Sequence, residues 1–217
     1  MGQLLCQKCK NYITHQPLSG CLVCGASATR GICRRHKLPY QRAYCVGRRQ
    51  GVLKKLIDDY KFHRVQAAAS VLAALFDATL PCFDQPVVLV PIPTAPRNTR
   101  RRGYDHMRLA ARQLARRRGL PLRSLLYRRS NAVQHFAVNA AQRRRQAKEF
   151  FGLRGAVSPD VTYILLDDIF TTGSTLREAA NVLREAGAAD IAIAVIARQG
   201  APQAATTTQT VSTNDDA

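Results

Sequence analysis

Apolar residues recur with helical spacing in four parts of the chain. Two such runs fill residues 51–80 and are separated by a polar break that contains Lys61 and His63. A third run follows the cationic stretch that begins at Arg97, and a fourth begins after residue 175 and ends near Gly187, a residue type that favours a helix C-terminus. The four apolar faces consist of Leu53, Leu56, Ile57 and Tyr60; Val71, Leu72, Leu75 and Phe76; Met107, Ala110, Ala111 and Leu114; and Leu176, Ala179, Ala180, Leu183 and Ala186.

Short apolar runs without a polar interruption predict strands that are buried on both faces of a parallel sheet. The clearest run is Tyr163–Leu166, and three others cover Pro86–Pro93, Leu120–Tyr127 and Asp190–Ala197. Together with the helices between them, these runs place the chain in the α/β class.

A polar stretch follows the run at residues 163–166 directly. Asp167 and Asp168 stand where the apolar run stops, and residues 171–175 read Thr-Thr-Gly-Ser-Thr before the last predicted helix. We therefore expect both acids to lie in a loop outside the core, between the carboxyl end of a strand and the N-terminus of a helix. Free backbone N–H groups and the helix dipole attract an anion there.

The residue types of this loop suit a phosphorylated sugar. Gly173 lets the backbone close around a phosphate, and four hydroxyl groups can donate to its oxygens. The two carboxylates can instead accept hydrogen bonds from a sugar diol, or hold a Mg²⁺ ion that the ligand carries.

Composition adds a strong positive charge to this picture. The chain has 217 residues with a formal net charge of +19, and sixteen of its Lys and Arg residues lie between Arg97 and Lys148 with one acid, Asp105. Such a surplus favours polyanions, and we expect Arg100, Arg101 and Arg102 to form a nucleic-acid patch. A solvated cationic surface is the alternative, and the stretch has few aromatic residues on which bases can stack.

Cysteine spacing predicts a metal site near the N-terminus. Three pairs occur there: Cys6 with Cys9, Cys21 with Cys24, and Cys33 with His36. Two such pairs complete a tetrahedral Zn²⁺ site. Cys21 and Cys24 are the best-supported ligands because Gly25 follows them. The preferred second pair is Cys33 with His36, and the alternative is Cys6 with Cys9. We expect a closed structural site rather than a catalytic one.

These features divide the chain into three parts. We expect a zinc-ribbon module at residues 1–47, a main domain at residues 48–199 and a disordered tail at residues 200–217. No stretch reads as a signal peptide or a membrane span, so we expect a cytoplasmic protein.

The stretch at residues 163–175 resembles the 5-phosphoribosyl-1-pyrophosphate (PRPP) signature of type I phosphoribosyltransferases. The resemblance implies the fold of that family, a Rossmann-like parallel sheet flanked by helices, here with the small zinc-ribbon module. It implies that Asp167 and Asp168 bind the ribose diol of PRPP, which carries Mg²⁺. The 5-phosphate site would consist of Thr171, Thr172, Gly173, Ser174 and Thr175.

Two further segments match this family by their order in the chain. The loop after residues 86–93 corresponds to the loop that binds the pyrophosphate, with Pro93, Thr94 and Arg97 as the matching residues. The cationic segment before residue 150 corresponds to the mobile loop that closes over PRPP, with Arg129, Gln134 and Arg143.

Over residues 6–198 the order of motifs resembles the ComF family, phosphoribosyltransferase-like proteins linked to DNA uptake in bacterial competence. The motifs are the zinc ribbon, V-P-I-P, R-R-G-Y-D-H, R-R-R-Q-A and L-L-D-D-I-F-T-T-G-S-T. Family members usually have Asn-Gln where this chain has Asp105 and His106, a departure that puts a polar role of these two residues in doubt. The resemblance implies single-stranded DNA and a DNA-uptake helicase as partners.

Three functions are consistent with these features. They are a transferase that breaks the bond between C1 and the pyrophosphate of PRPP, a DNA-uptake adaptor whose PRPP pocket is regulatory or vestigial, and a nucleobase-salvage enzyme with a zinc appendage. The pocket favours the first or the third, whereas the charge and the zinc module favour the second. No stretch can be assigned to a purine ring, which weighs against salvage. We therefore expect a PRPP-binding ComF-family protein that acts in natural competence, with an active phosphoribosyltransferase as the alternative.

Overall fold

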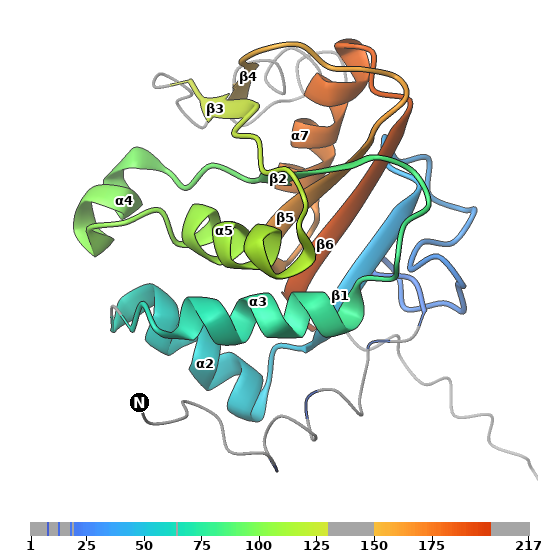
Figure 1. The fold of residues 1–217 in the computed structure, drawn as a ribbon. Helices are drawn as coiled ribbons and strands as arrows, with labels where there is room; N and C mark the ends of the chain where they lie inside the picture. Colours follow the sequence, from blue (N-terminus) through green and yellow to red (C-terminus); the bar gives the residue numbers. More distant parts are fainter. Residues whose placement is uncertain are drawn as a thin grey trace, which may run out of the picture.

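The main body of the protein is a parallel four-stranded sheet. The structure, a computed structural model, describes residues 20–63, 65–129 and 150–200 together with Lys8, Ile13 and Leu18. The strands are β1 (Arg42–Arg48), β2 (Val87–Pro91), β5 (Thr162–Phe170) and β6 (Asp190–Arg198), in the order β1-β6-β5-β2 (Figure 1). Every pairing in this sheet is parallel, so the carboxyl ends of all four strands lie at one edge.

Helices cover both faces of the sheet, which explains why its strands are apolar throughout. One face packs against α2 (Gly51–Phe62), α3 (Ala68–Thr79) and α5 (His106–Arg118) (Figure 1). The other packs against α7 (Ser174–Glu185) and an antiparallel ribbon of β3 (Leu126–Arg128) and β4 (Phe151–Leu153). The short helix α4 (Pro96–Arg102) follows β2. None of the helices in the described ranges has the length and apolar character that crossing a membrane requires.

Most elements agree with the hydrophobic pattern. The two helices predicted between residues 51 and 80 are α2 and α3, and the other two predicted helices are α5 and α7. The apolar faces are buried as expected, with the exception of Val71 and Ala186, which are partly exposed. The strand predicted at Leu120–Tyr127 is shorter and begins later, as β3. The sheet also contains β1, which the pattern did not predict and which includes residues on both sides of the boundary expected at residue 47.

The structure corrects one expectation about the acid pair. Asp167 and Asp168 do not lie in a loop, because β5 continues through them to Phe170. The apolar residues resume at Ile169 and Phe170, and both pair with the last residues of β6. Asp168 is therefore buried, with 7% of its surface exposed, near the carboxyl end of a central strand.

Candidate functional site

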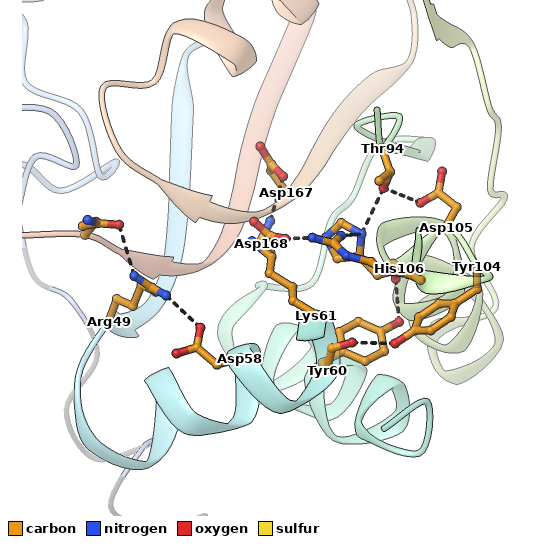
Figure 2. Close-up of polar contacts among 12 residues, drawn as sticks. Arg49, Asp58, Tyr60, Lys61, Thr94, Tyr104, Asp105, His106, Asp167 and Asp168 are labelled. Carbon is orange, nitrogen blue, oxygen red and sulfur yellow. Dashed lines mark hydrogen bonds and ion pairs between the residues drawn. The ribbon is translucent and has the colours of Figure 1, made fainter. Parts of the chain in front are cut away.

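Asp168 is bound by two groups from the helices that cover one face of the sheet. The Lys61 ammonium, at the end of α2, lies 2.7 Å from its Oδ2 atom. The Nε2 atom of His106, the first residue of α5, forms a hydrogen bond to the same oxygen (Figure 2). Burial alone would raise the pKa of Asp168, but the hydrogen bond from His106 and the charge of Lys61 outweigh burial and lower it. Asp168 is thus an ionised carboxylate, and Lys61 and His106 both contact its Oδ2 atom.

Asp167 lies in different surroundings, although it is the adjacent residue. Its side chain points away from that of Asp168 (Figure 2), as expected for neighbours in a strand, and its Oδ1 accepts a hydrogen bond of 2.9 Å from the backbone N–H of Asp168. Burial, and then the negative charge of Asp168, raise the pKa of Asp167 from 3.8 to about 7. Lys61 and Arg128 oppose this shift. Asp167 is therefore the more readily protonated of the two acids.

The loop after β5 opens directly into α7. Gly173 precedes the first helical residue with φ 74°, and a Cβ atom there would lie 2.5 Å from the Phe170 ring, so glycine is required for both reasons. Thr171, Thr172 and Ser174 are exposed, and Thr175 is partly buried. The Thr172 hydroxyl donates to the Ser174 hydroxyl at 3.1 Å. The hydroxyl groups and the N-terminus of α7 thus lie together at the edge where the acids lie.

The loop after β2 lies beside the acid pair. The backbone N–H of Ile92 donates to the Leu166 carbonyl at 2.9 Å, which continues the ladder between β2 and β5. The Thr94 hydroxyl contacts Asp105 Oδ1 at 2.9 Å and His106 Nδ1 at 3.0 Å, so it faces α5 in this structure.

Two cations differ in how closely they approach this loop. Arg128, the last residue of β3, donates from Nε to the Pro93 carbonyl at 2.8 Å. Arg97, in α4, is exposed.

A second cluster of candidate ligands lies in the N-terminal part of the chain. The ligand atoms of Cys21, Cys24, Cys33 and His36 all lie within 4.8 Å of one another. The turn that carries the first pair is closed by a 2.8 Å hydrogen bond from the Gly25 N–H to the Cys21 carbonyl. These are the four residues that the spacing favoured, whereas Cys6 and Cys9 lie outside the described residues.

The geometry of this cluster fits a tetrahedral metal ion. Zn–S bonds of about 2.3 Å place neighbouring sulfur atoms roughly 3.8 Å apart, and the Sγ atoms of Cys24 and Cys33 are 3.7 Å apart. His36 Nε2 is buried and has no hydrogen-bond partner among the described residues, as expected for a nitrogen that binds a metal. Burial would raise the pKa of the Cys21 thiol, but the N–H groups of Cys24 and Cys33 lower it to about 7.

Comparisons with known proteins agree with this architecture. The phosphoribosyl transferase domain family matches residues 107–215. Competence protein F of Haemophilus influenzae is 29% identical over 89% of this chain and 90% of its own length. DNA utilization protein YhgH of Salmonella typhi is 30% identical over the same shares, and competence protein ComFC of Bacillus subtilis is 26% identical over 85% and 80%. The chain belongs to the ComF family of phosphoribosyltransferase-like proteins.

In this ComF-family protein, two of the three arginines expected to form a nucleic-acid patch are exposed and one is buried. Arg100 and Arg101 are exposed on α4, but Arg102 is buried, with 8% of its surface exposed, and its Nη1 contacts His106 Nδ1 at 2.9 Å. Successive residues of a helix point in different directions, and the third arginine points into the protein. The prediction that Arg102 belongs to an exposed patch was therefore wrong.

The cationic segment expected to close over the ligand lies mainly outside the described part of the ComF-family fold. Arg129 is exposed, and its N–H donates to the Phe150 carbonyl at 3.2 Å at the base of this segment. Gln134 and Arg143 fall within residues 130–149, which the structure does not describe.

Sequence reasoning missed Lys61 and His106. Lys61 directly follows Tyr60, the last residue of the apolar face of the first helix. It is therefore the residue of the polar break that lies nearest to this buried face. The family resemblance assigns no polar role to His106, because family members usually have a different residue at this position. The available signal was its place at the start of α5, directly after the N-cap Asp105 and directly before the buried Met107.

Proposed function

We propose that this chain binds PRPP, or a related ribose 5-phosphate compound, together with Mg²⁺. The observation that carries the proposal is the adjacency of two unlike carboxylates at the end of β5 to the hydroxyl-rich loop that opens α7. The backbone and hydroxyl groups of residues 171–175 hold the 5-phosphate, and Asp167 and Asp168 accept hydrogen bonds from the ribose diol. The pyrophosphate lies beside the segment that contains Pro93, Thr94 and Arg97.

A calorimetric titration with PRPP and Mg²⁺ tests this site. The parent protein should bind PRPP, and ribose 5-phosphate should bind more weakly. Asp168→Asn should reduce PRPP affinity roughly tenfold to a hundredfold, because it removes a charge-assisted acceptor. Thr172→Val should weaken PRPP and ribose 5-phosphate alike, because both carry the 5-phosphate.

The controls separate binding from folding. Since Asp168 is buried and paired with Lys61, its substitution should also lower the melting temperature, so each variant is first checked for a cooperative unfolding transition. Asp84→Asn changes an exposed acid before β2, at the opposite edge of the sheet, and should leave affinity unchanged. No binding by the parent, or equal loss in Asp84→Asn and Asp168→Asn, would refute the site.

We also propose that the protein acts in DNA uptake and binds single-stranded DNA; one of its relatives is named DNA utilization protein YhgH and two are named competence proteins. The supporting observation is an exposed aromatic ring beside the cationic helix α4. Phe62 is 56% exposed, and the guanidinium groups of Arg101 and Arg102 each lie 5.8 Å from its ring centroid. A base can stack on such a ring while Arg100 and Arg101 contact phosphates. A helicase partner is proposed on family resemblance alone.

Fluorescence anisotropy with labelled oligonucleotides tests the DNA proposal. Arg100→Glu with Arg101→Glu should weaken binding and flatten its salt dependence by about 1–2 in the log–log slope, and Phe62→Ala should weaken it at every salt concentration. Arg48→Glu with Lys54→Glu makes the same charge change at other exposed positions. Equal effects of the two double variants would indicate a general charge effect and contradict the assigned patch.

We propose, finally, that Cys21, Cys24, Cys33 and His36 hold one structural Zn²⁺ ion. All four positions of the tetrahedron are then occupied by protein ligands, so the ion supplies cross-linking of the N-terminal turns rather than a site for water or substrate.

A further inference from the structure

Three buried side chains form a chain of contacts from α4 to β5. Arg102 is the last residue of α4, His106 is the first residue of α5, and Asp168 belongs to β5. They are 8%, 6% and 7% exposed. Arg102 Nη1 lies 2.9 Å from His106 Nδ1. His106 Nε2 forms a hydrogen bond with Asp168 Oδ2 (Figure 2). The arrangement joins the turn between α4 and α5 to the acid pair.

The contact with Arg102 decides where the proton of the imidazole lies. A guanidinium N–H group can only donate a hydrogen bond, so His106 Nδ1 must accept it through its lone pair. The ring proton is then on Nε2, from which it is donated to the Asp168 carboxylate. The Thr94 hydroxyl is compatible with this assignment, because its one hydrogen lies between two acceptors, Asp105 Oδ1 at 2.9 Å and His106 Nδ1 at 3.0 Å, and can be shared between them. A second ring proton, on Nδ1, would face the guanidinium hydrogens directly.

The backbone around His106 is fixed as well. The Tyr60 hydroxyl donates to the His106 carbonyl at 2.6 Å, and Asp105 caps α5 by accepting from the Arg108 N–H at 3.1 Å. These contacts come from α2 and from α5 itself, so the imidazole has little freedom to turn away from Asp168.

We propose that Arg102 and His106 are positioning residues for the ligand site, and that they keep Asp168 oriented for the ribose hydroxyls through a neutral imidazole. Lys61 and His106 both bind Oδ2, which leaves the lone pairs of Oδ1 for a hydroxyl of the ligand. The inference rests on the proposed PRPP site. It assigns to Arg102 a role in that site rather than in contact with DNA.

Glutamine and asparagine at position 106 separate positioning from general packing. A glutamine side chain can donate to Asp168 through its NH2 group and accept from Arg102 through its carbonyl oxygen. The two nitrogen atoms of a neutral imidazole do the same. Asparagine is one methylene shorter, so it keeps an acceptor near Arg102 but does not reach Asp168. His106→Gln should therefore bind PRPP within about threefold of the parent, whereas His106→Asn should bind about tenfold more weakly, since a hydrogen bond to a charged group is lost.

Calorimetry on variants that unfold cooperatively gives the result. Retained binding in His106→Gln with weakened binding in His106→Asn supports the proposal. Equal affinities of the parent and both variants, or equal losses in both variants, would overturn it.

A measurement without ligand distinguishes failure of this inference from failure of the proposed function. In a ¹⁵N NMR spectrum of the histidine side chains at pH 7, the His106 signals, assigned by their disappearance in His106→Gln, should show a protonated Nε2 and an unprotonated Nδ1. This result, with no PRPP bound by the parent, would refute the ligand site but retain the assigned proton. A protonated Nδ1 would overturn the inference whether or not PRPP binds.

Discussion

Two adjacent aspartates in this protein have opposite electrostatic surroundings. Asp168 faces Lys61 and His106, and its pKa is lowered. Asp167 is partly exposed and has no comparably close cation among the described residues; desolvation of its carboxyl group and the charge of Asp168 raise its pKa to about 7. A strand causes this separation, because successive side chains point to opposite sides. One acid is thus a fixed anion and the other takes up a proton near neutral pH.

The raised pKa of Asp167 predicts how stability depends on pH. The folded state binds the Asp167 proton more tightly than the unfolded state, in which the pKa is near 3.8. Its contribution to stability is therefore complete below about pH 4 and is lost as the pH rises to about 7. Asp167→Asn removes a carboxylate that is costly when ionised, so the variant should gain melting temperature relative to the parent at pH 8 and much less at pH 5.

Melting curves of both proteins at the two pH values check this. Asp84→Asn, which replaces an exposed acid, serves as the control and should show no such difference. A difference between Asp167→Asn and the parent that is the same at pH 5 and pH 8 would show that the Asp167 proton is not linked to folding.

At the scale of elements, the sequence predicted the order of strands and helices better than their ends. The apolar run at residues 163–166 correctly predicted a buried strand. Two charged residues appeared to terminate it, but the backbone pairing with β6 and the apolar Ile169 and Phe170 extend β5 through the acid pair to Phe170. The ladder of backbone hydrogen bonds decides where a strand ends, and this depends on the partner strand, which a local pattern does not contain.

The connection between β5 and α7 depends on Gly173, and Gly173→Ala tests it. The added Cβ would meet the Phe170 ring at 2.5 Å, and the backbone has φ 74°. The variant should lose about 2–4 kcal/mol of stability, from about 1 kcal/mol or more of backbone strain and a further cost for displacing the ring. PRPP affinity should fall with it.

Gly119→Ala provides a matched control for this change. Gly119 also has positive φ, at 65°, but a Cβ atom there would meet nothing within 4 Å. In denaturant unfolding, Gly119→Ala should lose only the stability that backbone strain costs, about 1 kcal/mol. Equal losses for the two glycine variants would show that the Phe170 contact is unimportant.

At the scale of the whole molecule, the N-terminal turns are joined to the sheet by a buried side chain. Arg198, the last residue of β6, donates from Nη2 to the Val23 carbonyl at 3.0 Å, between Cys21 and Cys24. The sequence predicted which four residues come together there, because C-x-x-C and C-x-x-H spacing brings two ligands to one point within each turn. It did not predict the pairing of β1 with β6, since partners 150 residues apart leave no local signal.

Metal analysis tests the role of the cysteine cluster. Protein purified without added zinc should contain about one Zn²⁺ per chain. Cys24→Ser should lose the metal and lower the melting temperature, because the turn that Arg198 contacts is no longer held. Cys82→Ser, which changes an exposed thiol outside the cluster, should retain both metal and stability. A fully folded parent protein without metal would contradict this role.

A crystal structure of the protein grown with PRPP and Mg²⁺ tests the central proposal most directly. We expect the 5-phosphate on the backbone of residues 171–175, with the ribose hydroxyls within hydrogen-bonding distance of Asp167 and Asp168. A cavity of about 730 Å³ lies elsewhere, beside the cysteine cluster, and is lined in part by Arg30, Arg34 and His36. PRPP bound in that cavity, or anywhere away from the end of β5, would contradict the proposed PRPP site.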